Sequence, residues 1–244
     1  PKGLEEVSWL RDPHVFHAPD GWYYFSASPN KGFERDLRYF RAQDLIGPWE
    51  DLGYLYTMEQ MRADPHWPDI KSDKDKTWNN SKAAWEPAMA FAKNTYWISC
   101  WFGGHGWGKD VVWKKSIGAL LRSTSGKPTG PYVYHSEWPH DWQGLFVDDD
   151  GSVYGTAGAG ALWKMNEDLT GMDPTWTGLD GQPVRGLGGK PVLGLRQSVD
   201  GRLMSEDCGY QLLKTEGRYV FFGLGGHCSY DQRVFWATDI RGPY

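Results

Sequence analysis

Four acidic residues stand at matching places in the chain and are the first candidates for chemistry: Asp12, Glu86, Asp141 and Glu206. Each precedes a short apolar run, a tight turn and a second aromatic run. Several carboxylates facing one concave site cannot all stay ionised, because like charges and partial burial raise one pKa while others stay low. Such a set separates a proton donor from a base, and glycoside hydrolysis needs that division.

Taken singly, each carboxylate also has an ordinary structural explanation. Asp12-Pro13 is a common turn dipeptide, and Glu206 fits simple surface charge. The run Asp148-Asp149-Asp150 is expected to be a solvated hairpin tip. The shared position in the repeat is what favours a functional role for the four acids.

Two Gly-Gly-His segments supply imidazoles at equivalent places in the second and fourth repeats. They are expected to lie beside the acidic residues, although two solvated loops would give the same sequence. His105 and His227 could also be metal ligands, but the sequence offers no third ligand at a recognised spacing. Trp and Tyr can cover the flat C–H faces of a sugar, which makes Trp85, Trp107 and Trp142 candidate substrate-binding residues. The other candidates are polar: Glu86, His105, His227 and Arg233.

The elements that carry these residues are predicted to be β-hairpins. Four segments, 11–25, 85–98, 141–154 and 205–222, share the plan of a strand, a turn and an aromatic strand. Asp-Gly between two apolar runs is a strong hairpin signal, because Gly accepts the positive φ that the strand twist requires. Helical periodicity is almost absent, which indicates an all-β protein.

The outer half of each repeat is visible as a Gly-Pro-aromatic unit after a strand, at 47–49, 130–132 and 242–244. Recurrence of both units predicts a single domain, 1–244, that is a five-bladed β-propeller of four-stranded antiparallel blades. The blades start near 12, 86, 141 and 206, and we expect the fifth to be incomplete or missing from this chain. A β-sandwich with similar turns is the alternative. In a propeller the first strands line the central channel, so the four acids would meet at one mouth of it.

Composition limits the class of protein. The 244 residues contain 26 basic and 31 acidic side chains, a formal charge of −5, and 15 Trp, 13 Tyr and 10 Phe. No basic run suits nucleic acid, and no apolar stretch reaches the ~18 residues of a membrane-spanning helix. Three cysteines cannot form a closed disulfide framework. We expect a carbohydrate substrate, an extracellular or periplasmic location, and no nucleic-acid or membrane partner; the oligomeric state stays open.

The motifs resemble those of glycoside hydrolase family 43, five-bladed propellers that act on arabinose-, xylose- and galactose-containing polysaccharides. Arg11-Asp12-Pro13 is similar to the opening motif, whose Asp is the catalytic base. The segments 146–154 and 85–87 are similar to two further blocks, and Ser205-Glu206 with 213–219 is similar to the block whose Glu is the general acid. The resemblance implies no required cofactor and allows for a structural Ca²⁺ or Na⁺ in the channel.

The chain departs from the family pattern where the family places an Asp that tunes the acid. Asp141 is the nearest candidate, but its spacing to Phe146 is about one residue longer than in the family pattern, so Gln143 could occupy that place. Glu86 of the neighbouring blade could then take over the role.

The prediction is therefore an inverting glycosidase with Asp12 as base, Glu206 as acid and Asp141 as tuner. Inversion needs carboxyl groups about 6.5–9.5 Å apart. A carbohydrate-binding propeller without turnover and a polysaccharide lyase on the same scaffold are the alternatives.

Overall fold

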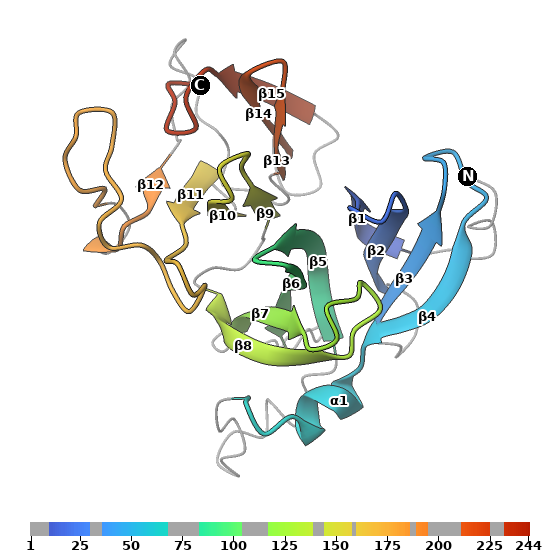
Figure 1. The fold of residues 1–244 in the computed structure, drawn as a ribbon. Coiled ribbons are helices and arrows are strands. Elements are labelled where there is room, and N and C mark those ends of the chain that lie inside the picture. The colour runs from blue at the N-terminus through green and yellow to red at the C-terminus, as the bar shows by residue number, and fades with distance from the viewer. Residues whose placement is uncertain are drawn as a thin grey trace, which may run out of the picture. The chain divides into compact units, whose positions relative to one another are not determined.

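The computed structural model covers the whole chain and describes residues 10–29, 36–67, 83–103, 117–138, 144–157, 160–185, 189–194, 211–224 and 232–244. The chain forms two compact units, residues 1–138 and residues 139–244. Each unit contains two antiparallel sheets, and within each sheet the strands are neighbours in chain order (Figure 1).

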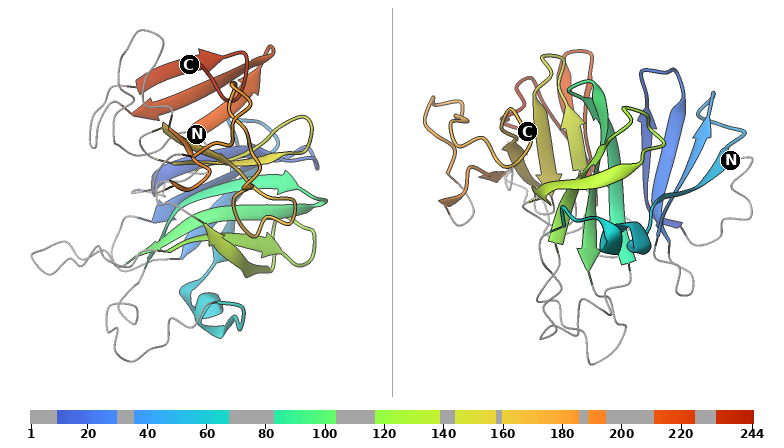
Figure 2. Two further views of the ribbon diagram at one scale, coloured as in Figure 1. Left: turned by 90° about the vertical axis from the view of Figure 1, so that its left-hand side faces the viewer. Right: turned by 60° about the horizontal axis from the view of Figure 1, so that its bottom comes forward.

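The described residues of the first unit form two four-stranded sheets and one short helix between them in the chain. Its elements are β1 (Leu10–His17), β2 (Tyr23–Pro29), β3 (Leu37–Ala42), β4 (Glu50–Tyr56), α1 (Met58–Ala63), β5 (Ala83–Ala92), β6 (Thr95–Gly103), β7 (Ile117–Ser123) and β8 (Tyr132–Trp138). The first strands of the two sheets are neighbours, because the backbone N–H of Met89 in β5 donates to His14 in β1. Figure 2 shows the meander β5 to β8 from two further sides.

In the second unit, the part of the chain that the structure describes forms a four-stranded and a three-stranded sheet. Its strands are β9 (Gly144–Val147), β10 (Val153–Ala157), β11 (Ala161–Lys164), β12 (Leu193–Gly194), β13 (Gln211–Thr215), β14 (Arg218–Leu224) and β15 (Gln232–Ala237). The four hairpins that the sequence predicts are therefore confirmed for the described residues, and so is the all-β class with four-stranded antiparallel sheets.

The hairpin turns follow their sequence signals. The turns at Asp20-Gly21 and Asp150-Gly151 share one geometry, with the glycines at φ 85° and 81°. In both turns the aspartate side chain accepts a hydrogen bond from the backbone N–H two residues later. Asp20 accepts from Trp22 at 3.0 Å, and Asp150 accepts from Ser152 at 2.8 Å. This Asx turn is why Asp precedes Gly in these positions.

The Gly-Pro-aromatic units at 47–49 and 130–132 lead into the outer strands β4 and β8, and the third unit, at 242–244, follows β15. The hydroxyl of Tyr132 donates to the Pro128 carbonyl at 2.9 Å, and that of Tyr244 donates to the Ile240 carbonyl at the same distance. Both rings are buried. The repeat therefore extends to the contacts of its aromatic residue.

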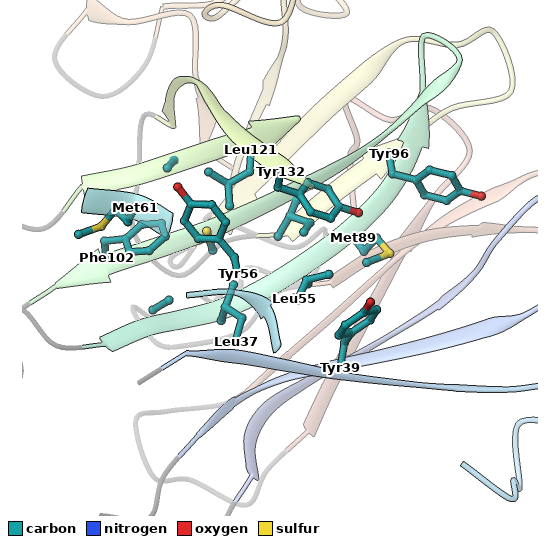
Figure 3. Packing of buried hydrophobic residues seen from close by; sticks show 14 of the residues in the cluster. Leu37, Tyr39, Leu55, Tyr56, Met61, Met89, Tyr96, Phe102, Leu121 and Tyr132 are labelled. Atoms are coloured by element: carbon teal, nitrogen blue, oxygen red, sulfur yellow. The ribbon is translucent and has the colours of Figure 1, made fainter. Parts of the chain in front are cut away.

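Apolar side chains of both sheets and of α1 form the core of the first unit, shown in Figure 3. Leu37, Phe102 and Leu121 are fully buried there. Burial of a side chain of this size stabilises a fold by about 1.5–3 kcal/mol. The second unit has its own cluster, centred on Leu162 and Phe221.

The helix α1 was not predicted from the sequence. Thr57 and Gln60 form a capping box at its start: Thr57 accepts the Gln60 N–H at 3.0 Å, and Gln60 accepts the Thr57 N–H at 2.8 Å. The pattern Thr-x-x-Gln is a known start signal, but six residues are too few to show helical periodicity. Within the described ranges, none of the helices has the length and apolarity to cross a membrane.

Candidate active site

The first strand β1 carries a β-bulge at the acid–proline pair that contains the predicted base. Its pairing with β2 shifts between Arg11 and His14, so Asp12 and Pro13 together face a single residue of β2. Bulges are frequent beside active sites because they redirect a side chain. Asp12 therefore stands at an irregular point of the sheet.

The first strand of the second sheet repeats this feature. The pairing of β5 with β6 shifts between Trp85 and Ala88, so Glu86 and Pro87 together face one residue of β6. Asp12 and Glu86 thus occupy the same position in two successive sheets, as the repeat predicts.

Glu86 has an unusual backbone conformation for a residue inside a strand. Its φ is 51°, in the left-handed region, and the residue is buried, with 9% of its surface exposed. Such a conformation costs a non-glycine residue on the order of 1–3 kcal/mol and persists only where the surroundings enforce it. The neighbouring sheet supplies those surroundings.

Two buried serines of β2 bond to the β5 bulge on both sides of its peptide. Ser28 accepts the backbone N–H of Glu86 at 2.7 Å, and Ser26 donates its hydroxyl to the Pro87 carbonyl at 3.3 Å. Ser28 is itself the strand partner of Arg11. Glu86 therefore lies beside the bulge that contains Asp12.

His14 adds a third bond between the same strands. Its Nδ1 accepts the Met89 backbone N–H at 3.3 Å. Burial lowers the pKa of His14 to about 4, so the ring is neutral near pH 7 and carries its proton on Nε2. We name this set of contacts, made by Ser26, Ser28 and His14, the neutral joint.

A different set of contacts joins the first strands of the two sheets in the second unit. Asp148, directly after β9, accepts the Lys214 ammonium at 2.7 Å and the Tyr219 hydroxyl at 2.6 Å. Lys214 also pairs with Asp149 at 2.8 Å. Burial alone would raise the pKa of Asp148, but the bonds from Lys214 and Tyr219 outweigh it and lower that pKa. We name this set the charged joint.

The charged joint corrects one expectation. Asp148 is not part of a solvated hairpin tip, because its side chain is 9% exposed, whereas that of Asp149 is 84% exposed. The sequence could not separate the two, since both pair with Lys214 and only burial and the bond from Tyr219 distinguish Asp148. The segments 146–154 and 213–219, which resemble family motifs, are therefore joined by the contacts of Asp148 with Lys214 and Tyr219.

The structure locates four of the predicted site residues. Asp12 and Glu86 lie in the paired bulges, Trp85 in β5 is the partner of Trp101, and Arg233 in β15 is the partner of Gly223. The other predicted residues lie outside the described ranges: His105, Trp107, Asp141, Trp142, Glu206 and His227. Convergence of Asp12 with Glu206 therefore stays a prediction.

Metal ligands do not gather in the part of the chain that the structure describes, where His, Cys, Asp and Glu form no group of three or more suited to an ion. The Ca²⁺ or Na⁺ that the family resemblance allows is untested by this. Cys100 is buried, and burial raises the pKa of its thiol well above the ordinary value.

Sequence comparison finds no match, either among protein-family models or among curated proteins. Solved structures do match. A GH43 protein from Bacillus licheniformis, solved as a mutant, has a TM-score of 0.64 at 21% identity, over 97% of this chain and 41% of that chain. A GH43 β-xylosidase/α-arabinofuranosidase from a compost metagenome, in a calcium-free complex with xylotriose, scores 0.62 at 15%, over 96% of this chain and 76% of that chain.

A third match is the exo-β-1,3-galactanase of Phanerochaete chrysosporium with β-1,3-galactotriose, at a TM-score of 0.61 and 14% identity, over 96% of this chain and 48% of that chain. The chain has the fold of the GH43 enzymes. That fold is a β-propeller, so the predicted fold class is confirmed. The chain spans less than half the length of the first and third of these proteins.

Sequence reasoning missed the residues of the neutral joint. Ser26 and Ser28 alternate with Ala27 in an otherwise aromatic strand. Two small polar residues on one face of a strand were the available signal, because a buried hydroxyl needs a partner. Nothing in the sequence showed that the partner would be the Glu86-Pro87 peptide.

Proposed function

We propose that the chain is a glycoside hydrolase acting on a xylose-, arabinose- or galactose-containing saccharide. The observation that carries the proposal is the pair of acid–proline bulges, Asp12-Pro13 and Glu86-Pro87, at the same register in successive sheets of a GH43-like fold. A β-bulge interrupts the regular alternation of side chains along a strand. It can therefore direct an acidic side chain toward a site that regular pairing would not reach.

In the proposed mechanism Asp12 is the general base and Glu206 is the general acid. Glu206 protonates the glycosidic oxygen while Asp12 removes a proton from the water that attacks the opposite face of the sugar. The anomeric configuration is thereby inverted. Asp141 tunes the acid, since a neighbouring carboxylate raises the pKa of a carboxyl group.

The substrate class follows from two sources. Matching structures hold xylotriose and β-1,3-galactotriose, and the chain is rich in aromatic residues that suit sugar faces. Substrate contacts are assigned to Trp85, Glu86, His105, Trp107, Trp142, His227 and Arg233.

The test is a screen of aryl xyloside, arabinofuranoside and galactoside hydrolysis, followed by Asp12→Asn and Glu206→Gln. Loss of a general acid or base costs roughly 100- to 10,000-fold in rate, and we expect losses in this range with a nearly unchanged melting temperature. Asp180→Asn is the matched control, because Asp180 lies in an exposed turn where its side chain bonds only to the Gln182 N–H among the contacts described.

Four outcomes would contradict the proposal in different ways. Near-normal turnover by Asp12→Asn rejects the assigned roles, and retention of configuration in an NMR assay rejects inversion. Oligosaccharide binding without turnover indicates a binding propeller, and a product absorbing in the ultraviolet indicates a lyase.

A further inference from the structure

Glu86 is held in a conformation that its residue type disfavours. Five non-glycine residues in the described ranges have positive φ: Glu86, Lys93, Asn94, Leu169 and Glu216. Four of them lie in turns, where such a φ is ordinary, and only Glu86 lies within a strand. Glycine would adopt this φ without strain, so the presence of a glutamate requires a reason beyond the turn of the chain.

The adjacent sheet fixes that conformation through one short bond. The Glu86 N–H cannot join the β5–β6 ladder at the bulge, and it donates instead to Ser28 Oγ at 2.7 Å. Ser28 is completely buried, and the Ser26 hydroxyl holds the following carbonyl, that of Pro87. Both ends of the Glu86-Pro87 unit are therefore fixed from β2.

The same serines connect the two bulges. Ser28 pairs with Arg11, and Ser26 pairs with His14, so the two serines flank the point of β2 that faces Asp12-Pro13. A movement of β2 would shift Glu86 together with the Asp12 bulge. Ser28 thus couples the backbone of one candidate carboxylate to the strand pair that carries the other.

We propose that Ser28 is a positioning residue for Glu86, and that the Glu86 carboxylate accepts a hydroxyl group of the bound sugar. The inference rests on the proposed function, and it names Glu86 as a binding rather than a proton-transferring carboxylate. Ser28 acts only through the backbone of Glu86 and does not touch the sugar.

The experiment is a double-mutant cycle of Ser28→Ala and Glu86→Ala, measured by KM and kcat on the hydrolysed aryl glycoside and by calorimetric binding of xylotriose and β-1,3-galactotriose. Loss of one hydrogen bond that positions a ligand is expected to weaken binding about tenfold. We expect Ser28→Ala to raise KM and Kd by about that factor with a smaller change in kcat. Ser28→Cys, with a weaker acceptor, is expected to fall between.

Ser99→Ala is the matched control. Ser99 is completely buried in β6 opposite Ala88, next to the same bulge, and its hydroxyl has no hydrogen-bond partner among the described residues. Ser99→Ala removes a hydroxyl oxygen from similar buried surroundings and leaves the hydrogen bond of the Glu86 N–H unchanged. We expect wild-type KM and Kd, and its melting temperature shows what loss of a buried hydroxyl does by itself.

The cycle decides between positioning and simple packing. If Ser28 acts through Glu86, Ser28→Ala has no further effect on KM or Kd in the Glu86→Ala background. Full additivity, or a Ser28→Ala protein equal to Ser99→Ala, overturns the inference while wild-type hydrolysis leaves the proposed function standing. A wild-type protein that binds but does not hydrolyse rejects the hydrolase alone, since the cycle is then read on Kd. A wild-type protein that does neither overturns both.

Discussion

Neighbouring sheets are joined in two chemically different ways in the two units. The neutral joint of the first unit uses buried serines and an uncharged histidine, and it lies where β5 begins, at the bulge. The charged joint of the second unit uses an Asp–Lys–Tyr set, and it lies at the hairpin turns, where β9 and β13 end. One joint is adjacent to two candidate site carboxylates, Asp12 and Glu86, whereas the other lies beside two hairpin turns.

The difference follows from electrostatics. A lysine beside Asp12 or Glu86 would favour their ionised forms and lower their pKa values. Neutral hydrogen bonds fix the backbone there without adding a charge. At the hairpin end no such restriction applies, and an ion pair with a tyrosine can fix the register of two hairpins.

The largest expected effect separates the joints by pH. The pKa of His14 is about 4 in the fold and about 6.5 in an unfolded chain, so the unfolded state binds the proton first as the pH falls. The stability of the first unit should be full above pH 6.5 and decline toward pH 4, by roughly 1–3 kcal/mol. Urea unfolding followed by tryptophan fluorescence measures this.

His14→Asn is the matched variant, because the amide oxygen can accept the Met89 N–H in place of Nδ1 and does not titrate. We expect it to flatten the stability profile between pH 4 and 6.5. A variant profile as steep as that of the wild type would reject a titrating neutral joint.

Asp148→Ala should give the next largest effect, in the second unit. It removes the acceptor of both Lys214 and Tyr219, and loss of charge-assisted bonds at a largely buried group costs about 2 kcal/mol. Because the fold lowers the pKa of Asp148, its contribution is present above about pH 4, the pKa of an unfolded Asp, and is lost below it. Asp149→Ala is the control, and an equal loss in both variants would contradict a special role of Asp148.

Tyr219→Phe removes a single bond of the charged joint, the 2.6 Å contact of its hydroxyl with Asp148. Tyr219 is buried, so the ring keeps its packing. The expected loss of unfolding free energy is about 1.5 kcal/mol, smaller than for Asp148→Ala. Tyr219→Phe as damaging as Asp148→Ala would show that Lys214 contributes nothing.

Salt should give the smallest effect and the sharpest contrast. The Lys214 pair is partly exposed, so ions of the buffer screen it. Raising NaCl from 0.05 to about 1 M should reduce the difference between wild type and Lys214→Met. The difference between wild type and Ser28→Ala should not respond. A stability difference between wild type and Ser28→Ala that changes with salt would contradict a joint made of neutral hydrogen bonds.

The sequence determined those features whose cause lies within a few residues. Asp20-Gly21 and Asp150-Gly151 fix hairpins because glycine accepts positive φ and aspartate closes the turn, and apolar and aromatic runs fix the strands between them. The repeat in the sequence also places Asp12 and Glu86 at equivalent positions.

Tertiary structure alone decided which neighbour each polar group meets. Ser28 and Glu86 are far apart in the chain, as are Asp148 and Lys214, and bonds of this kind depend on two sheets packing in one register. The six residues of α1 likewise depend on their cap and on the burial of Met58 and Met61. Local chemistry determines strands and turns, whereas the bond to the left-handed backbone of Glu86 comes from a serine of another sheet.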